Sequence, residues 1–405
     1  MTASTTITTT SNYGPIYPPF NPFVRHPTSP LGKVRMILCG SILVPIRLTG
    51  AILTLSSCLI WCNICSIGCS DLSKPYSPTR RRLLQGGCRV FSRILLFWYG
   101  FVWLHESHEI EDKEEREKQP HPSVVVVNHI GFAELMYLCY SDGCCFVSKD
   151  TNRALPFIGK ISEVLQSIYV DRGEGEGGRS IHGGQQQGEA SSSSSTTMQN
   201  SRSHTSDVSS ASGGGGSNAK STTEKILERA HSPPGTWPPL AICPEGTTHT
   251  GHVMIRFATG AFRAGLPIQP VIVSSPFSSR FGYDPSFSCA NIVMHIICLM
   301  TQPMNHLHVK HLAVYVPNDA EKKDPTLYAN NVRRKMAQEL GVECYDLTWN
   351  EKLRFERAEK ARELGNQRLA AKNGGVVPPM PIFTEDAFGN PLVEKVESGS
   401  KKKND

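Results

Sequence analysis

A histidine and an acid follow a short run of valines. In VVVVNHIGFAE, residues 124–134, four valines lead into Asn128 and His129, and Glu134 follows the histidine five positions later. A histidine can serve as a general base near neutral pH, and a carboxylate within reach can hold its ring in one tautomer. The same pair can equally be a buried histidine with its hydrogen-bond partner. The pair alone therefore leaves catalysis and packing open.

Polar residues also follow two other apolar runs: Arg172 after QSIYVD, and Glu245, Gly246 and Thr247 after LAICP. Taken singly, the arginine can be a surface cation and the PEGT turn can be a helix cap. If the three runs are parallel strands of one sheet, their carboxyl ends face one edge, where open α/β sheets bind ligands. The three polar groups would then meet in one cleft, which favours a functional site.

The segment from 123 to 317 alternates β-branched runs with helical patterns. This alternation predicts an α/β fold with a mostly parallel sheet flanked by helices. The predicted strands are SVVVV, GCCFVSK, QSIYVDR, LAICPEG, PIQPVIV and LAVYVP. Residues 173–220 are rich in Gly, Ser and Gln, and we expect them to form a disordered insertion because they cannot bury enough apolar surface.

The N-terminal third predicts contact with a membrane. Residues 1–33 read as a disordered lead, and residues 34–69 as a membrane-embedded helix or hairpin. The part from 48 to 69 is long enough to span a bilayer. Pro45 and Arg47 leave two alternatives, one spanning helix or a hairpin broken at the proline. We favour the hairpin, because an arginine is costly at the bilayer centre.

Two flanking regions complete the domain prediction. Residues 70–118 are expected to form an interfacial helix and a charged linker, since the apolar run 94–104 is short and rich in aromatic residues. The arginines at 80–82 can meet lipid headgroups. Residues 348–405 are expected to form a charged helix and a flexible tail.

The net charge and the cysteine positions argue against a nucleic-acid-binding protein, a zinc protein and a disulfide-stabilised scaffold. The net charge of +6 is too small to indicate nucleic acid as a partner, and it suits the anionic face of a membrane. Of thirteen cysteines, four lie at helical spacing in the apolar stretch: Cys58, Cys62, Cys65 and Cys69. No pair of CxxC motifs at zinc spacing occurs, so we interpret them as reduced thiols packed in a helix, with no metal site or disulfide scaffold.

Four blocks occur in a familiar order: NHIGFAE, PFIGKISEVLQSIYVDR, CPEGTTHTG and LPIQPVIV. They resemble the motifs of the membrane-bound glycerolipid acyltransferases, the PlsC-like family. NPFV (21–24) and the segment from LAVYVP to QELGV resemble its lysophosphatidylcholine/lysophosphatidylethanolamine acyltransferase branch. The resemblance covers residues 21–347 apart from the insertion, and it makes residues 119–347 the acyltransferase domain.

The resemblance implies direct transfer of an acyl chain from acyl-CoA to the free hydroxyl of a lysophospholipid, with lysophosphatidylcholine or lysophosphatidylethanolamine favoured. It makes His129 the general base and Glu134 the acid that orients it. The residues it implies for substrate binding are Arg172, Glu245, Gly246, Thr247 and Arg256. Among them, we expect Glu245 to orient Arg172 or the loop. No cofactor or metal is implied, and the partners are acyl-CoA, lysophospholipid and the lipid bilayer.

Two departures from the family pattern keep alternatives open. Glu134 stands where the family usually has Asp, and Ala258 stands where the family often has the Lys of FKxGAF, with Arg256 as the nearest cation. The alternatives are a lysophosphatidate acyltransferase and a weakly active or inactive membrane lipid-binding scaffold. Lys402 and Lys403 near the C-terminus resemble a dilysine retrieval signal, which implies the endoplasmic reticulum membrane with the catalytic domain in the cytosol.

Overall fold

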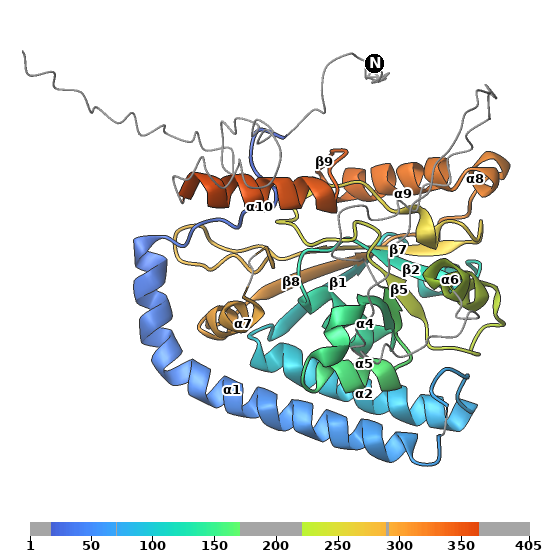
Figure 1. The fold of residues 1–405 in the computed structure, drawn as a ribbon, viewed down its shortest axis with the longest axis horizontal. Coiled ribbons are helices and arrows are strands. Elements are labelled where there is room, and N and C mark those ends of the chain that lie inside the picture. The colour runs from blue at the N-terminus through green and yellow to red at the C-terminus, as the bar shows by residue number, and fades with distance from the viewer. Residues whose placement is uncertain (1–17, 70, 171–220, 289–290, 364–405) are drawn as a thin grey trace, which may run out of the picture.

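A computed structural model describes residues 18–69, 71–170, 221–288 and 291–363 (Figure 1). Four sequence predictions lie wholly or partly outside the described residues: the lead, of which residues 1–17 are not described, the insertion at 173–220, the substrate residue Arg172, and the tail with Lys402 and Lys403. The helix predicted after residue 348 is present as α10, Trp349–Glu363.

A seven-stranded sheet forms the centre of the molecule, in the order β1-β8-β7-β2-β5-β3-β4. The strands are β1 Trp103–His108, β2 Val124–Val127, β3 Cys145–Lys149, β4 Ile168–Val170, β5 Leu240–Ile242, β7 Ile268–Ser274 and β8 His306–His311. Every pairing is parallel except that of β7 with β8. The prediction of an α/β fold with a mostly parallel sheet is confirmed.

Helices cover both faces of this sheet (Figure 1). Because side chains alternate along a strand, Val125 and Val127 share a core with α1, α2, α4 and α7, whereas Val124 and Val126 share one with α6 and α9. The helices are α1 Pro30–Ser66, α2 Pro78–Trp98, α3 Lys113–Glu117, α4 Ala133–Ser141, α5 Ile158–Val164, α6 Thr222–His231, α7 Ile292–Met300, α8 Asp319–Lys323 and α9 Pro325–Leu340. A valine run buried on both faces is typical of a central parallel strand.

Two small elements lie beside the main sheet. β6 (Val253–Met254) pairs with β9 (Glu343–Cys344) in a parallel two-stranded sheet. Single turns of 3₁₀-helix are formed by Asp150–Ala154 and Thr259–Ala261. The pairing of β6 ties the chain that follows the PEGT turn to the segment after α9.

Two predictions need correction, one of a helix and one of a strand. The apolar run 94–104 is not one interfacial helix: α2 ends at Trp98, Gly100 has a φ of +90°, and the chain enters β1 at Trp103. A positive φ is accessible to glycine and ends the helical path there. The run 312–317 is also not a strand, since it makes only an isolated bridge from Tyr315 to Ile268. The strand beside it is β8, with the polar sequence HLHVKH.

The N-terminal apolar segment is one helix. α1 runs unbroken through Pro45 and bends (Figure 1), as helices commonly do at a proline. The hairpin that we favoured is therefore wrong. Arg47 is buried against the domain and donates hydrogen bonds to the carbonyls of Met300, Gln302 and Pro303. Of the helices in the described ranges, α1 alone is long and apolar enough to cross a membrane.

Candidate active site

His129 lies just past the carboxyl end of β2, where its neighbour anchors the backbone. The side-chain amide of Asn128 donates to the carbonyl of Val273 at 2.9 Å, and its oxygen accepts from the Val273 N–H at 2.7 Å. Asn128 is fully buried. This bridge continues the contact between β2 and β7 beyond the last paired residues, so the position of His129 is fixed by the sheet.

Glu134 holds the imidazole of His129 from the first turn of α4. Its Oε1 lies 2.8 Å from His129 Nδ1 and accepts a second hydrogen bond from the Gly131 N–H at 2.8 Å. Because a carboxylate only accepts, Nδ1 carries the ring proton and Nε2 presents a lone pair. The N-terminus of α4 also favours a negative charge on Glu134. This is the tautomer that a general base requires.

Glu134 forms its hydrogen bond with His129 although its side chain is longer than the family's usual Asp. Glu134 is fully buried, while His129 keeps 21% of its side chain exposed. Oε2 of Glu134 has no hydrogen-bond partner among the described residues. The departure from the family's usual Asp therefore preserves the pair with His129.

Cys243, the first residue after β5, is a neighbour of His129 that the sequence analysis missed. Burial lowers the pKa of His129, but contact with Cys243 and with Glu134 raises it, and the net pKa lies well above the usual histidine value. The pairing of β2 with β5 explains this proximity, since Val126 lies opposite Ile242. The imidazole is thus a stronger base than an ordinary histidine.

Glu245 of the PEGT turn connects this pair to the loop that follows β5. Its Oε2 accepts from the backbone N–H of His129 at 2.6 Å. Its Oε1 accepts from His249 Nε2 at 2.8 Å and from the Ile255 N–H at 3.2 Å. The side chain is buried and all these partners are donors. Glu245 therefore organises the loop, while its expected contact with Arg172 lies outside the described residues.

His249 completes the connection and was also missed by the sequence analysis. Its Nδ1 accepts from the Gly251 N–H at 3.0 Å, so its Nε2 carries the proton and donates to Glu245. The residue is completely buried. Its position four residues after Glu245 in EGTTH was the available signal, although that spacing alone also fits an ordinary loop histidine.

The rest of the turn is held in a compact form. Gly246 has a φ of +68°, a conformation that glycine adopts without strain, and Thr247 is buried. Arg256 follows Ile255 directly, with an exposed side chain and its backbone N–H bound to the Leu347 carbonyl at 3.1 Å. The structure thus places Glu245, Gly246 and Thr247 on the turn beside His129, whereas Arg256 lies beyond β6 and next to Leu347.

Segments near both ends of the described chain form hydrogen bonds with the loop that follows β5. The Thr250 N–H donates to the carbonyl of Pro22 at 2.9 Å, which places the NPFV segment against the turn. From α10, Lys352 Nζ donates to the carbonyl of Thr248 at 3.0 Å. Phe23 lies between them in a small core that includes Phe355. These contacts explain why NPFV accompanies the other motifs.

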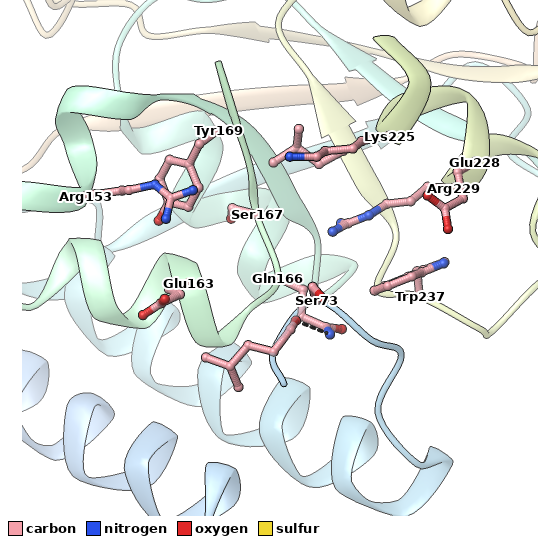
Figure 2. A pocket seen from close by; sticks show the side chains of 12 residues that line it. Ser73, Arg153, Glu163, Gln166, Ser167, Tyr169, Lys225, Glu228, Arg229 and Trp237 are labelled. Carbon is pink, nitrogen blue, oxygen red and sulfur yellow. Dashed lines mark hydrogen bonds between the residues drawn. The ribbon is translucent and has the colours of Figure 1, made fainter. Parts of the chain in front are cut away.

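A separate hollow of about 450 Å³ lies beside β4 (Figure 2). Its walls carry Arg153, stacked 4.0 Å from the centre of the Tyr169 ring, and Arg229, stacked 4.6 Å from the centre of the Trp237 ring. The hollow lies along the edge strand β4 and is also lined by residues of α6. None of the residues around His129 lines it.

Comparisons with known proteins agree with this geometry. Residues 108–274 match the family model described as Acyltransferase. Lysophospholipid acyltransferase LPEAT1 of Arabidopsis thaliana is 30% identical over 278 residues, which cover 64% of this chain and 60% of the relative. Lysophospholipid acyltransferase LPCAT4 of Homo sapiens is 28% identical over 325 residues, covering 80% of this chain and 53% of the relative. The chain therefore spans little more than half the length of these relatives.

Among solved structures, the 1-acyl-sn-glycerophosphate (LPA) acyltransferase PlsC from Thermotoga maritima is similar, with a TM-score of 0.43 and 12% sequence identity. The alignment covers 76% of this chain and 96% of that structure.

Proposed function

We propose that this chain, whose residues 108–274 match the Acyltransferase family model and which is similar to lysophospholipid acyltransferases, transfers an acyl chain from acyl-CoA to the free hydroxyl of a lysophospholipid, with lysophosphatidylcholine or lysophosphatidylethanolamine favoured. The observation that carries the proposal is the pair of His129 and Glu134 at the carboxyl edge of the sheet, with the ring tautomer of a general base. A hydroxyl is a weak nucleophile and needs such a base.

In the proposed reaction, Nε2 of His129 takes the hydroxyl proton as the oxygen attacks the thioester carbonyl. The carbon–sulfur bond then breaks, and the imidazolium returns the proton to the departing thiolate of CoA. Glu134 stabilises the imidazolium through Nδ1. A positioned base of this kind contributes roughly 10²–10⁴-fold, and alignment of the two substrates supplies much of the remainder. The reaction needs no cofactor.

The acceptor phosphate is assigned to Arg172 and the EGT turn. An arginine fork matches phosphate oxygens in a bidentate way. The negative charge of Glu245 is not an obstacle, because its two oxygens already accept three hydrogen bonds inside the loop. Arg256, an exposed cation just after β6, is proposed as a further contact of this phosphate.

The pH profile should report the environment of His129. Burial lowers its pKa, but Cys243 and Glu134 raise it to well above the usual value, so the basic form appears only at higher pH. We expect kcat/KM to rise with pH through a pKa above the ordinary value of about 6.5. Cys243→Ala removes one of the contacts that raise the pKa of His129, so the rise in kcat/KM should move to lower pH. Cys344→Ala should leave this pH dependence unchanged. A rise at or below about 6.5 in the unmodified enzyme would contradict this assignment.

We also propose that the chain lies on a bilayer through the outer faces of α1 and α2. Large apolar side chains are exposed along both helices: Ile37, Leu38, Ile42, Ile46, Leu53 and Ile60 on α1, and Leu83, Val90 and Phe97 on α2. The opposite side of α1 is attached to the domain through Arg47, which makes a helix lying along the membrane surface the better fit than one crossing it.

Charged residues on this face should abolish membrane binding. We expect Leu38→Glu combined with Leu53→Glu to release the protein from liposomes of zwitterionic and anionic lipid in a flotation assay. The matched control is Val316→Glu, a comparably exposed valine outside α1 and α2. Flotation of the double variant at the level of the control would show that the outer face of α1 is not the membrane contact.

An acceptor panel tests the proposed activity. The full chain, purified in lipid nanodiscs, would receive labelled acyl-CoA together with lysophosphatidylcholine, lysophosphatidylethanolamine, lysophosphatidylserine or lysophosphatidate. We expect transfer to lysophosphatidylcholine or lysophosphatidylethanolamine. A strong preference for lysophosphatidate would instead support the alternative of a lysophosphatidate acyltransferase. No transfer to any acceptor by folded protein would support the lipid-binding scaffold.

A further inference from the structure

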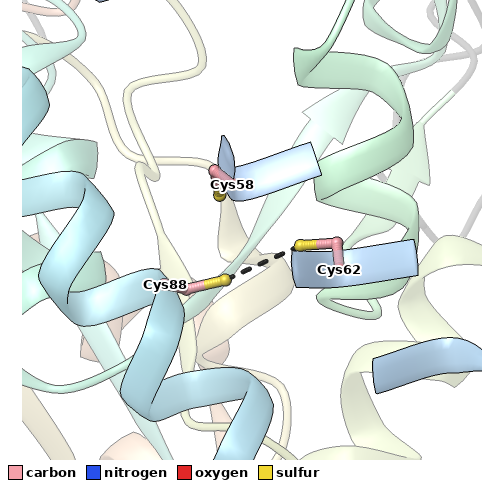
Figure 3. A group of neighbouring side chains, drawn as sticks. All are labelled: Cys58, Cys62 and Cys88. Carbon is pink, nitrogen blue, oxygen red and sulfur yellow. Dashed lines mark hydrogen bonds between the residues drawn. The ribbon is translucent and has the colours of Figure 1, made fainter. Parts of the chain in front are cut away.

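Three buried cysteines converge between the first two helices (Figure 3). Cys58 and Cys62 are one turn apart on α1, so both face the interior, and Cys88 approaches them from α2. Their Sγ atoms all lie within 4.8 Å of one another, and those of Cys62 and Cys88 are 3.9 Å apart. No other group of three or more histidine, cysteine or acidic side chains in the described ranges is as closely spaced.

The spacing fits sulfur atoms that share one metal ion. Two sulfurs bound to one ion at about 2.3 Å lie about 3.8–4.0 Å apart in tetrahedral or trigonal geometry. A disulfide instead requires a separation of about 2.05 Å and would leave the third thiol unused. Other buried cysteines of this chain, Cys144 and Cys145, form no comparable group, so burial of cysteine alone does not explain the convergence.

The ligand set and its surroundings select the kind of ion. Thiolates prefer soft cations such as Cu(I) and Zn(II) over Mg²⁺ or Ca²⁺, which take oxygen ligands. The three cysteines are at most 4% exposed, and Tyr76, Leu84 and Val164 pack around them in the same core. An apolar shell of this kind limits access of water to a bound ion.

We propose that Cys58, Cys62 and Cys88 form a structural binding site for one thiophilic d¹⁰ cation, Cu(I) or Zn(II), that joins α1 to α2. The sequence did not suggest it, because the third ligand is 26 residues from the second in the chain and lies on another helix. Cys65 and Cys69, which complete the sequence cluster, do not belong to the group. Since α2 packs against α4, which carries Glu134 in its first turn, the ion would fix the pair of membrane helices onto the catalytic domain.

Metal content of the full-length protein tests the proposal. The protein would be purified in detergent under reducing conditions, incubated separately with Zn²⁺ or with Cu⁺ under anaerobic conditions, desalted, and measured by elemental mass spectrometry. We expect the unmodified protein and the Cys344→Ser control to retain about one ion per chain, and the Cys62→Ser/Cys88→Ser variant to retain less than a tenth of that. The two incubations show which cation the site takes.

Thermal stability gives a second readout that does not depend on the variant folding well. A chelator selective for the retained ion should lower the unfolding midpoint of the unmodified protein by several degrees, and adding the ion back should restore it. The double variant should not respond to either step. Equal metal retention by the unmodified protein and the double variant, or no retention by either, would overturn the proposal.

Discussion

Replacing His129 with alanine should lower the rate of acyl transfer by about 10²–10⁴-fold, which is the contribution of a positioned general base. The alanine leaves no group to take the hydroxyl proton at the edge of β2. Binding should change little, because the imidazole acts only as the oxygen attacks. We therefore expect kcat to fall with KM nearly unchanged, measured with labelled acyl-CoA and the preferred acceptor in nanodiscs.

The matched control for this prediction is His105→Ala on the edge strand β1. His105 is exposed and lies outside the group around Glu134, so its loss should leave kcat unaffected. Glu134→Gln should reduce kcat as well, because the amide can present either an oxygen or an NH₂ to the ring and no longer enforces the tautomer. Glu134→Asp should retain more activity than Glu134→Gln. Transfer by His129→Ala at the level of His105→Ala would remove His129 from the mechanism.

The contact between His129 and Glu134 was predictable because its geometry is local. His129 and Glu134 are five residues apart, and the end of a buried strand followed by a helix start brings them together. The convergence of β2 and β5 also followed from sequence, because both are short apolar runs of the kind buried in a parallel sheet. What the sequence could not show was Cys243 as a neighbour of His129, since that contact depends on which strands pair.

The membrane segment shows why the hairpin prediction failed. Arg47 looks like an unpaired charge in an apolar run, which argues for a break near an interface. In the structure three backbone carbonyls of the segment 300–303 accept hydrogen bonds from it. These partners lie more than 250 residues away, so the feature that seemed to interrupt the helix is the one that attaches it to the domain.

β1 and β8 were missed for a different reason. Both carry several histidines and charged residues, WLHESH and HLHVKH, which depart from the β-branched runs typical of buried strands. β1 is the edge of the sheet, and β8 joins it to β7 with half of its side chains facing outward. Only their pairing identifies them as strands, β8 with the apolar β7 and β1 with β8, and pairing is a property of the tertiary structure.

Loss of the Glu245 carboxylate should be the most disruptive change outside the pair of His129 and Glu134. Three donors point at its two oxygens: the backbone N–H groups of His129 and Ile255, and Nε2 of His249. In Glu245→Gln one oxygen becomes an NH₂, so at least one buried donor faces another donor. Each buried group left unsatisfied costs about 1–3 kcal/mol. We expect kcat to fall by about 10²-fold, since small displacements of a reacting group have costs of that order.

A loss of activity could also follow from general destabilisation, and Glu321→Gln separates the two causes. Glu321 is likewise buried and accepts hydrogen bonds from Tyr315, Asn331 and the Asn318 N–H, but it lies on α8 and contacts none of the residues around His129. Both variants should lower the unfolding midpoint by similar amounts, measured by differential scanning fluorimetry. When kcat is measured at a temperature below the unfolding midpoint of both variants, only Glu245→Gln should show a lower kcat. If both variants lose activity in proportion to their stability, Glu245 supports the fold without positioning the base. If Glu245→Gln alone loses activity, the carboxylate that the motif supplies acts on catalysis through the backbone of His129.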